Sequence, residues 1–106
     1  MTDAMVVLIT APDEDDAATI SRALVEANLA ACVNIIGNIR SLYRWQGKVE
    51  DAREALMIVK TRKGLLAELT KKVKELHRYT VPEIIALPIA YGLEEYLGWL
   101  RQETRG

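Results

Sequence analysis

The sequence predicts an α+β fold of the ferredoxin-like class, in which two βαβ units are split across one antiparallel sheet and a further helix closes the chain. Its apolar patterns follow in the order strand, helix, strand, strand, helix, strand, helix. The chain has 106 residues, a length that fits one domain covering residues 1–106, and 50% of them are hydrophobic. A proline in the last predicted strand favours a place at the sheet edge, which this topology gives that strand.

The first strand and helix are predicted within the first thirty residues. Residues 5–10 form a short apolar run, which is typical of a covered strand. Pro12 ends the run, and four acidic residues then favour the positive end of a helix. Apolar residues at positions 20, 23, 24 and 27 predict a helix that ends at about Leu29.

A long antiparallel hairpin is predicted next. Residues 31–36 form an apolar run, Gly37-Asn38 allows a bend or bulge, and residues 39–45 alternate between two faces. Gln46-Gly47 forms a plausible turn into the strand at residues 48–59. Because the two arms extend beyond what two helices can cover, we expect them to pack on neighbouring copies in a closed oligomer.

The last third of the chain predicts a helix, an edge strand and a short closing helix. The second helix follows Gly64 and ends near Tyr79. Residues 83–90 form the last strand, whose Pro88 cannot donate to a ladder. The closing helix covers residues 93–101.

Composition excludes several classes of protein. The 14 basic and 15 acidic residues give a formal charge of −1, which argues against nonspecific binding to nucleic acid or to an anionic membrane. The lone Cys32 excludes an intrachain disulfide and favours a reducing compartment. The N-terminus lacks a signal-peptide pattern, and no apolar stretch is long enough to span a membrane, so we expect a cytoplasmic protein. The sequence has no recognisable catalytic set and no motif for an organic cofactor, so an enzyme is not expected.

Five stretches of the sequence resemble the CutA family of divalent-cation tolerance proteins. They are LAACVNII at 29–36, SLYRWQGK at 41–48, LMIVKT at 56–61, LHRYTVPEIIALPI at 76–89 and YLGWL at 96–100. The resemblance implies a cytoplasmic homotrimer with an architecture like that of the PII signalling proteins, in which long hairpins cross between subunits. It also implies a non-enzymatic role in tolerance of copper and other divalent cations, through weak metal binding or as a scaffold.

Cys32 and His77 are the candidate metal ligands. The family's matching cysteine implies a copper ligand, and a thiolate with an imidazole suits copper. A lone cysteine is more often a small buried hydrophobic residue, and a histidine at a helix end is more often a capping or surface residue. The sequence leaves open whether the two side chains meet within one subunit or across an interface.

Five further residues are candidates for a cleft between subunits that binds a small ligand. They are Lys60, Trp45, Tyr79, Glu83 and Trp99. The alternative function is therefore a PII-like sensor that binds an anionic metabolite, with Lys60 as the cation. The competing explanations are that the aromatic residues pack an oligomer interface and that Lys60 is a solvated strand exit or forms a salt bridge with Glu54 or Glu83.

Overall fold

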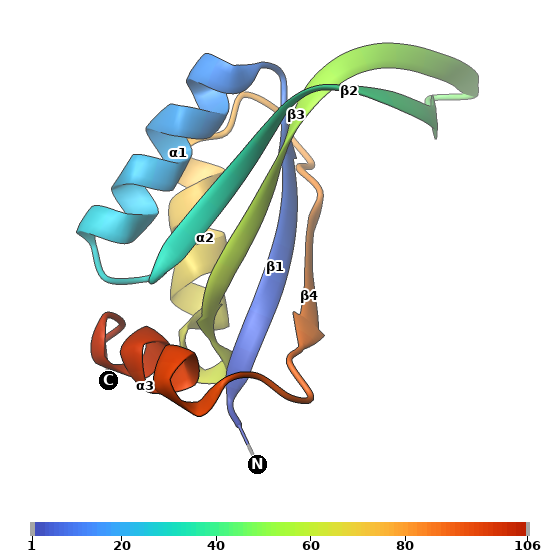
Figure 1. Cartoon of the computed structure of the whole chain (residues 1–106). Helices are drawn as coiled ribbons and strands as arrows, with labels where there is room; N and C mark the ends of the chain where they lie inside the picture. Colours follow the sequence, from blue (N-terminus) through green and yellow to red (C-terminus); the bar gives the residue numbers. More distant parts are fainter. Residues whose placement is uncertain (1, 106) are drawn as a thin grey trace.

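The computed structural model describes residues 2–105 and confirms the predicted order of elements in an α+β fold (Figure 1). A short 3-10 helix, Lys63–Leu65, precedes the second α-helix. The strands and α-helices are β1 (Ala4–Ala11), α1 (Glu14–Glu26), β2 (Cys32–Trp45), β3 (Lys48–Arg62), α2 (Leu66–Leu76), β4 (Ile84–Pro88) and α3 (Glu94–Gln102).

The four strands form one antiparallel sheet in the order β2-β3-β1-β4. Strand β4 lies at the edge, as Pro88 predicts, and Pro88 is paired with Met5 at the end of the ladder. The predicted strand at 83–90 is shorter in the structure, because β4 ends at Pro88 and the preceding chain bends around the end of β1.

Helices α1 and α2 cover one face of the sheet (Figure 1). Alternate residues of β1 and β3 point to this face because side chains alternate along a strand. They pack with the apolar stripes of both helices into the main core. The fully buried large side chains of this core are Val7, Ile9, Ile20, Leu24, Met57, Val59, Leu69 and Val73.

Helix α1 begins at a capped N-terminus and ends earlier than the periodicity predicts. The carboxylate of Asp13 accepts a hydrogen bond from the backbone N–H of Asp16 at 2.8 Å. The helix ends at Glu26 rather than near Leu29 because Asn28 adopts a left-handed conformation with φ of 58°.

Helix α2 also ends early, at Leu76 rather than near Tyr79. The backbone N–H of His77 still donates to the carbonyl of Val73 at 2.8 Å, but the backbone of His77 is extended. The residues that follow form a loop, which runs to the start of β4 at Ile84. We call residues 78–83 the α2–β4 loop.

The second face of the sheet, which we call the open face, is apolar and largely uncovered by residues 2–105. Helix α3 reaches only one end of the sheet, where Leu100 packs against Ala4 and Ala31. Apolar side chains of all four strands point to the open face, and they are Val6, Leu8, Ile36, Leu56, Ile58, Ile85 and Leu87. No helix long and apolar enough to cross a membrane occurs in the described part of the chain.

The β2–β3 hairpin continues well past the end of β1 and curves away from the helices (Figure 1). We call residues 39–53 the hairpin arm. Gln46 and Gly47 form its two-residue turn, with φ of 50° and 80°. A bulge at Gly37-Asn38 shifts the register by one residue, and Asn38 has φ of 57°.

Candidate functional site

A hollow lies between the hairpin arm and the α2–β4 loop. Its volume is about 840 Å³. The structure brings three of the five predicted cleft residues, Trp45, Tyr79 and Glu83, to this hollow. The other lining residues are Thr10, Arg40, Ser41, Leu42, Tyr43, Glu54, Arg78, Thr80, Val81 and Pro82.

Lys60 and Trp99, the other two predicted cleft residues, do not line this hollow. Lys60 stands opposite Cys32 on the open face, where its ammonium group hydrogen-bonds to the side chain of Asn34. It forms no salt bridge with Glu54 or Glu83 among the described residues. Trp99 belongs to α3, where its ring lies 5.5 Å from that of Tyr96.

Glu54 is a buried carboxylate at the base of the hairpin arm, and it was not predicted as a site residue. Only 6% of its surface is exposed. The phenol of Tyr79 donates a hydrogen bond to Glu54 Oε2 at 2.8 Å. Burial raises the pKa of Tyr79 to about 12, and the bond to Glu54 adds to the shift. The sequence does carry a signal for this residue. Glu54 shares a strand face with the apolar residues Leu56 and Ile58, where a charged side chain is unusual.

His77 holds the α2–β4 loop against the sheet. Of the two alternatives to a metal ligand, it is the C-cap residue of α2, and it does not lie at the surface. It is 8% exposed. Its Nε2 lies 2.7 Å from the carbonyl oxygen of Thr10, beyond the last β1–β4 pair, while Nδ1 accepts from the backbone N–H of Tyr79 at 3.0 Å. A carbonyl only accepts, so Nε2 carries the proton. Both ring nitrogens are therefore occupied by the protein itself.

Cys32 and His77 do not meet within one chain. Cys32 is paired with Lys60, and Lys60 is paired with Val6 of β1. The ring of His77 contacts Thr10, four residues further along β1, which corresponds to roughly 13 Å along a strand. Cys32 instead has the ammonium of Lys60 at 4.0 Å from its sulfur.

A metal centre within one chain does not fit the donors that the structure provides. Among residues 2–105, no group of three or more His, Cys, Asp or Glu side chains is placed to hold a metal ion. The closest charged neighbour of the cysteine sulfur is a cation, which opposes copper binding at that point. Tyr96 also lies beside Cys32, and the pKa of Tyr96 is raised by burial and, to a smaller extent, by that thiol.

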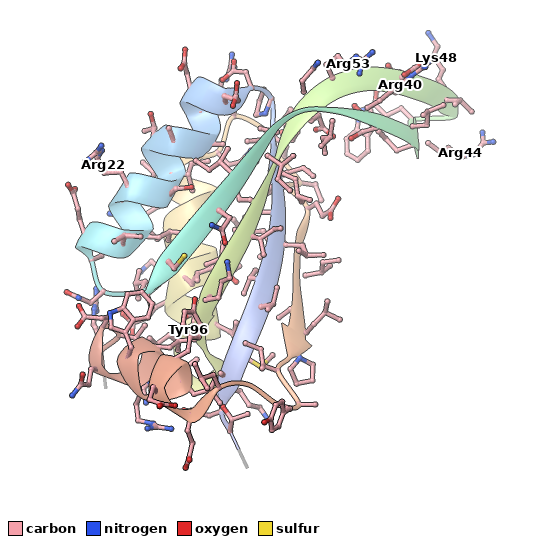
Figure 2. All side chains as sticks on the ribbon, in the orientation of Figure 1. Arg22, Arg40, Arg44, Lys48, Arg53 and Tyr96 are labelled. Carbon is pink, nitrogen blue, oxygen red and sulfur yellow. The ribbon has the colours of Figure 1, made fainter. Side chains whose placement is uncertain are left out.

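The two arginines at the hollow are held by acidic partners. Arg40 binds Asp51 through two hydrogen bonds of 2.9 and 2.6 Å, and this contact lowers the pKa of Asp51. Arg78 binds Asp13, at 3.1 Å, and Asp16 at the start of α1. Arg40 lies on the hairpin arm with Arg44, Lys48 and Arg53 (Figure 2).

Comparisons with known proteins agree with the fold and with the motifs. The family model of the CutA1 divalent ion tolerance proteins matches residues 5–103. A divalent-cation tolerance protein CutA of Thermus thermophilus is 58% identical over 99 residues, which make up 93% of this chain and 96% of that protein. Human protein CutA is 49% identical over 96 residues, covering 91% of this chain and 54% of its own length. The chain thus spans about half the length of its plant and animal relatives.

Solved structures give the same result in three dimensions. The structure of a divalent cation tolerance protein from Thermus thermophilus superposes with a TM-score of 0.94 and 56% sequence identity, covering 96% of this chain and 99% of that one. CutA1 from Oryza sativa superposes with a TM-score of 0.95 and 45% identity, covering 98% of this chain and 95% of that one.

Proposed function

Because the chain belongs to the CutA1 family of divalent ion tolerance proteins, we propose that it acts in tolerance of divalent cations, copper among them, as a homotrimer that is not an enzyme. The observation that carries this proposal is the open face of the sheet. Two-layer folds bury each apolar face of a sheet, and here one face has helices and the other has none over its centre. Further copies of the chain are the proposed cover.

The hairpin arm supports the same assembly. Its side chains Leu42, Tyr43, Trp45 and Val49 are exposed, and they do not contact the main core. Tyr43 and Trp45 lie on one face of the arm, and Leu42 and Val49 lie on the other. Exposed apolar surface of this kind marks an interaction surface. We propose that each arm crosses to a neighbouring copy, as in PII-like trimers, so that these apolar side chains are buried in the assembly.

Copper binding is proposed as weak and as a property of the assembly. Within one chain Cys32 finds no second donor of the expected kind, since His77 uses both ring nitrogens. A thiolate suits Cu(I), and the other donors would come from neighbouring copies. The alternative role in metal tolerance is that of a scaffold, which needs no donors from neighbouring copies.

The proposed location is the cytoplasm. This proposal rests on the reducing compartment that a lone cysteine favours and on the family resemblance. The relatives include a protein of Arabidopsis thaliana named as chloroplastic and a protein of Archaeoglobus fulgidus named as periplasmic, so the named location varies among them. Fractionation of the native cell tests it directly.

A second candidate function is that of a sensor that binds a small molecule in the hollow. The observation that favours it is the convergence of Trp45, Tyr79 and Glu83 on one space of about 840 Å³. Ligand sites are concave and mostly apolar, with a few polar groups that orient the ligand. Lys60 was the predicted binding group for an anionic ligand. It lies beside Cys32 and does not line the hollow, so it does not support an anion there.

Two separate variants test the leading proposal, one with a charge on the open face and one with a charge on the outer side of α1. Ile36→Glu alters the open face, and Val25→Glu makes the same change at similar exposure, 46% against 41%, on the outer side of α1. Both variants are introduced into a bacterium that lacks its own CutA protein, and growth is measured on graded copper. We expect the Val25 variant to support growth like the wild type and the Ile36 variant to fail, with a lower native mass. Equal growth of both would contradict a functional assembly on the open face.

A further inference from the structure

We propose that the hollow between the hairpin arm and the α2–β4 loop receives the hairpin arm of a neighbouring copy, and that Arg44 of the incoming arm pairs with Glu83 there. The inference rests on the leading proposal, an assembly of copies, and it names the two surfaces that meet. It assigns the hollow to a segment of protein rather than to a small ligand. The features that carry it are the two apolar faces of the arm, the carboxylates of the hollow and the exposed cation at the end of the arm.

The hairpin arm exposes apolar side chains on two opposite faces. Tyr43 and Trp45 lie on the face that Glu54 shares, because side chains alternate along both paired strands. Leu42 and Val49 lie on the opposite face, and each is 64% exposed. An arm that rested on one neighbour would bury only one of these faces. Two apolar faces therefore indicate an arm that lies between two neighbouring copies.

The bulge at Gly37-Asn38 decides which side chains of the arm turn to each face. Without the extra residue, Asn38 instead of Ile39 would lie opposite Glu54, and every side chain of β2 beyond that point would change faces. The bulge therefore turns the aromatic side chains of the arm to the side of Glu54, which lines the hollow, and it turns Arg44 to the other side.

Two carboxylates at the hollow have no cationic partner within residues 2–105. Glu54 is 6% exposed and accepts one hydrogen bond, from the neutral phenol of Tyr79. Glu83 is exposed at the hollow and forms no ion pair in the same part of the chain. The two arginines that line the hollow already bind other acidic residues. A buried carboxylate is costly unless a cation or further donors compensate it, so a neighbouring copy is expected to supply the cation.

Arg44 is the cation that fits this place. It lies at the end of the arm (Figure 2), and it forms no ion pair with any residue that the structure describes. It shares a face with Leu42 and Val49, whereas Lys48 lies on the opposite face. Arginine binds a carboxylate through two parallel hydrogen bonds, so one incoming guanidinium compensates Glu83. One face of the arm thus matches the hollow in both charge and apolar surface.

The proposed contact joins unlike surfaces, the arm of one copy and the hollow of the next. Contacts of this kind either close into a ring or continue as a filament, whereas contacts between like surfaces stop at a dimer. In a closed ring of three, every hollow is filled and every arm is received by a neighbour. Both faces of each arm are then covered, as their apolar side chains require.

Charge reversal tests the pair in the full-length protein. Arg44→Glu and Glu83→Arg are each expected to raise the subunit concentration at which half of the trimer dissociates by about tenfold or more. The double variant is expected to return this concentration to within about threefold of the wild-type value. Native mass across a dilution series, at one fixed urea concentration, gives the values. Arg22→Glu and Glu75→Arg make the same changes at exposed positions of α1 and α2, and they are expected to leave the trimer unchanged.

Cross-linking shows which surfaces meet, and it keeps the test valid if a charge reversal impairs folding. Arg44→Cys and Glu83→Cys are combined in a chain whose own thiol is removed by Cys32→Ser. A short bis-maleimide is expected to join this double variant into covalent trimers. The two single variants, when they are co-expressed, are expected to give covalent dimers only, and neither is expected to cross-link alone.

The outcomes separate this inference from the proposed assembly. A trimer that tolerates both charge reversals, or that gives no covalent trimer, overturns the docking of the arm in the hollow and leaves the assembly standing. A double variant that dissociates like the single variants overturns the ion pair. Cross-linked dimers from Arg44→Cys alone indicate contact between like surfaces and also overturn the inference. A wild-type protein that is a monomer contradicts the assembly and this inference together.

Discussion

The two faces of the sheet differ in how completely this chain covers them. On one face, α1 and α2 bury Val7, Ile9, Met57 and Val59 completely. On the other, the neighbouring residues Leu56 and Ile58 of the same strand remain only half buried. Strand β3 therefore has one face in the main core and one face that residues 2–105 leave half exposed. This difference is the basis of the proposal that further copies of the chain cover the open face.

The hairpin arm extends this contrast to one end of the molecule. Leu24 of α1 is fully buried, whereas Leu42 of the arm is 64% exposed. Both residues are leucines in regular secondary structure, so their different exposure comes from what packs around each side chain. Substitutions in the core, in the arm and at the helix ends test this contrast, and the largest effect on stability is expected in the core.

The largest effect is expected from Leu24→Ala. This change opens a cavity under α1, and it should lower the free energy of unfolding by about 2–5 kcal/mol. Leu42→Ala is the matched change on the arm. Its cost should be smaller and should depend on chain concentration, because it arises only where copies meet. Urea unfolding at several concentrations measures both, and equal, concentration-independent losses would contradict the difference between core and arm.

His77→Ala tests the contact that fixes the α2–β4 loop. It removes partners from the carbonyl of Thr10 and the N–H of Tyr79, and it should cost about 1–3 kcal/mol. Arg78→Ala, which breaks exposed ion pairs next to it, should cost less than about 1 kcal/mol. The comparison uses thermal or urea unfolding. A harmless His77 change would show that the loop is held by other contacts.

Alkaline pH tests the pair of Tyr79 and Glu54. The pKa of Tyr79 is about 12 in the folded chain and about 10 when unfolded, so the folded state holds the proton more tightly. The resulting stability is complete below pH 10 and is lost as pH rises toward 12, at no more than about 1.4 kcal/mol per pH unit. Tyr79→Phe should remove this part of the decline. Parallel pH profiles for the two proteins would argue against the raised pKa.

The smallest effect is expected at the start of α1. Asp13→Ala removes the cap on Asp16 and one partner of Arg78, and it should cost about 1 kcal/mol. Asp15→Ala, in the first turn but without a capping bond, should cost only a few tenths. Unfolding curves for the two variants give the difference, and similar losses would mean that charge rather than capping matters there.

Much of the fold could be predicted from the sequence because its signals are local. The apolar periods of residues 5–10 and 20–27 depend on neighbouring positions, and Pro88 carries its own preference for an edge. Element ends were predicted less well. Helix α2 ends at Leu76 because His77 turns its ring to a carbonyl of β1, a contact distant in sequence.

The site was harder to predict because it depends on register. The two-residue turn alone would pair Cys32 with Thr61, and the one-residue bulge at Gly37-Asn38 moves its partner to Lys60. The sequence indicates a possible bulge at this point, but it does not show that the bulge changes the partner of Cys32. The predicted cleft was one between subunits. In the single chain, Trp45, Tyr79 and Glu83 line one hollow, whereas Lys60 lies on the open face beside Cys32.

The central claim is that further copies of the chain complete the open face and the hairpin arm. Native mass spectrometry of the wild-type protein at micromolar concentration tests it most directly. The account predicts one dominant species with three times the chain mass of 11.9 kDa. A dominant species at the mass of a single chain would contradict it.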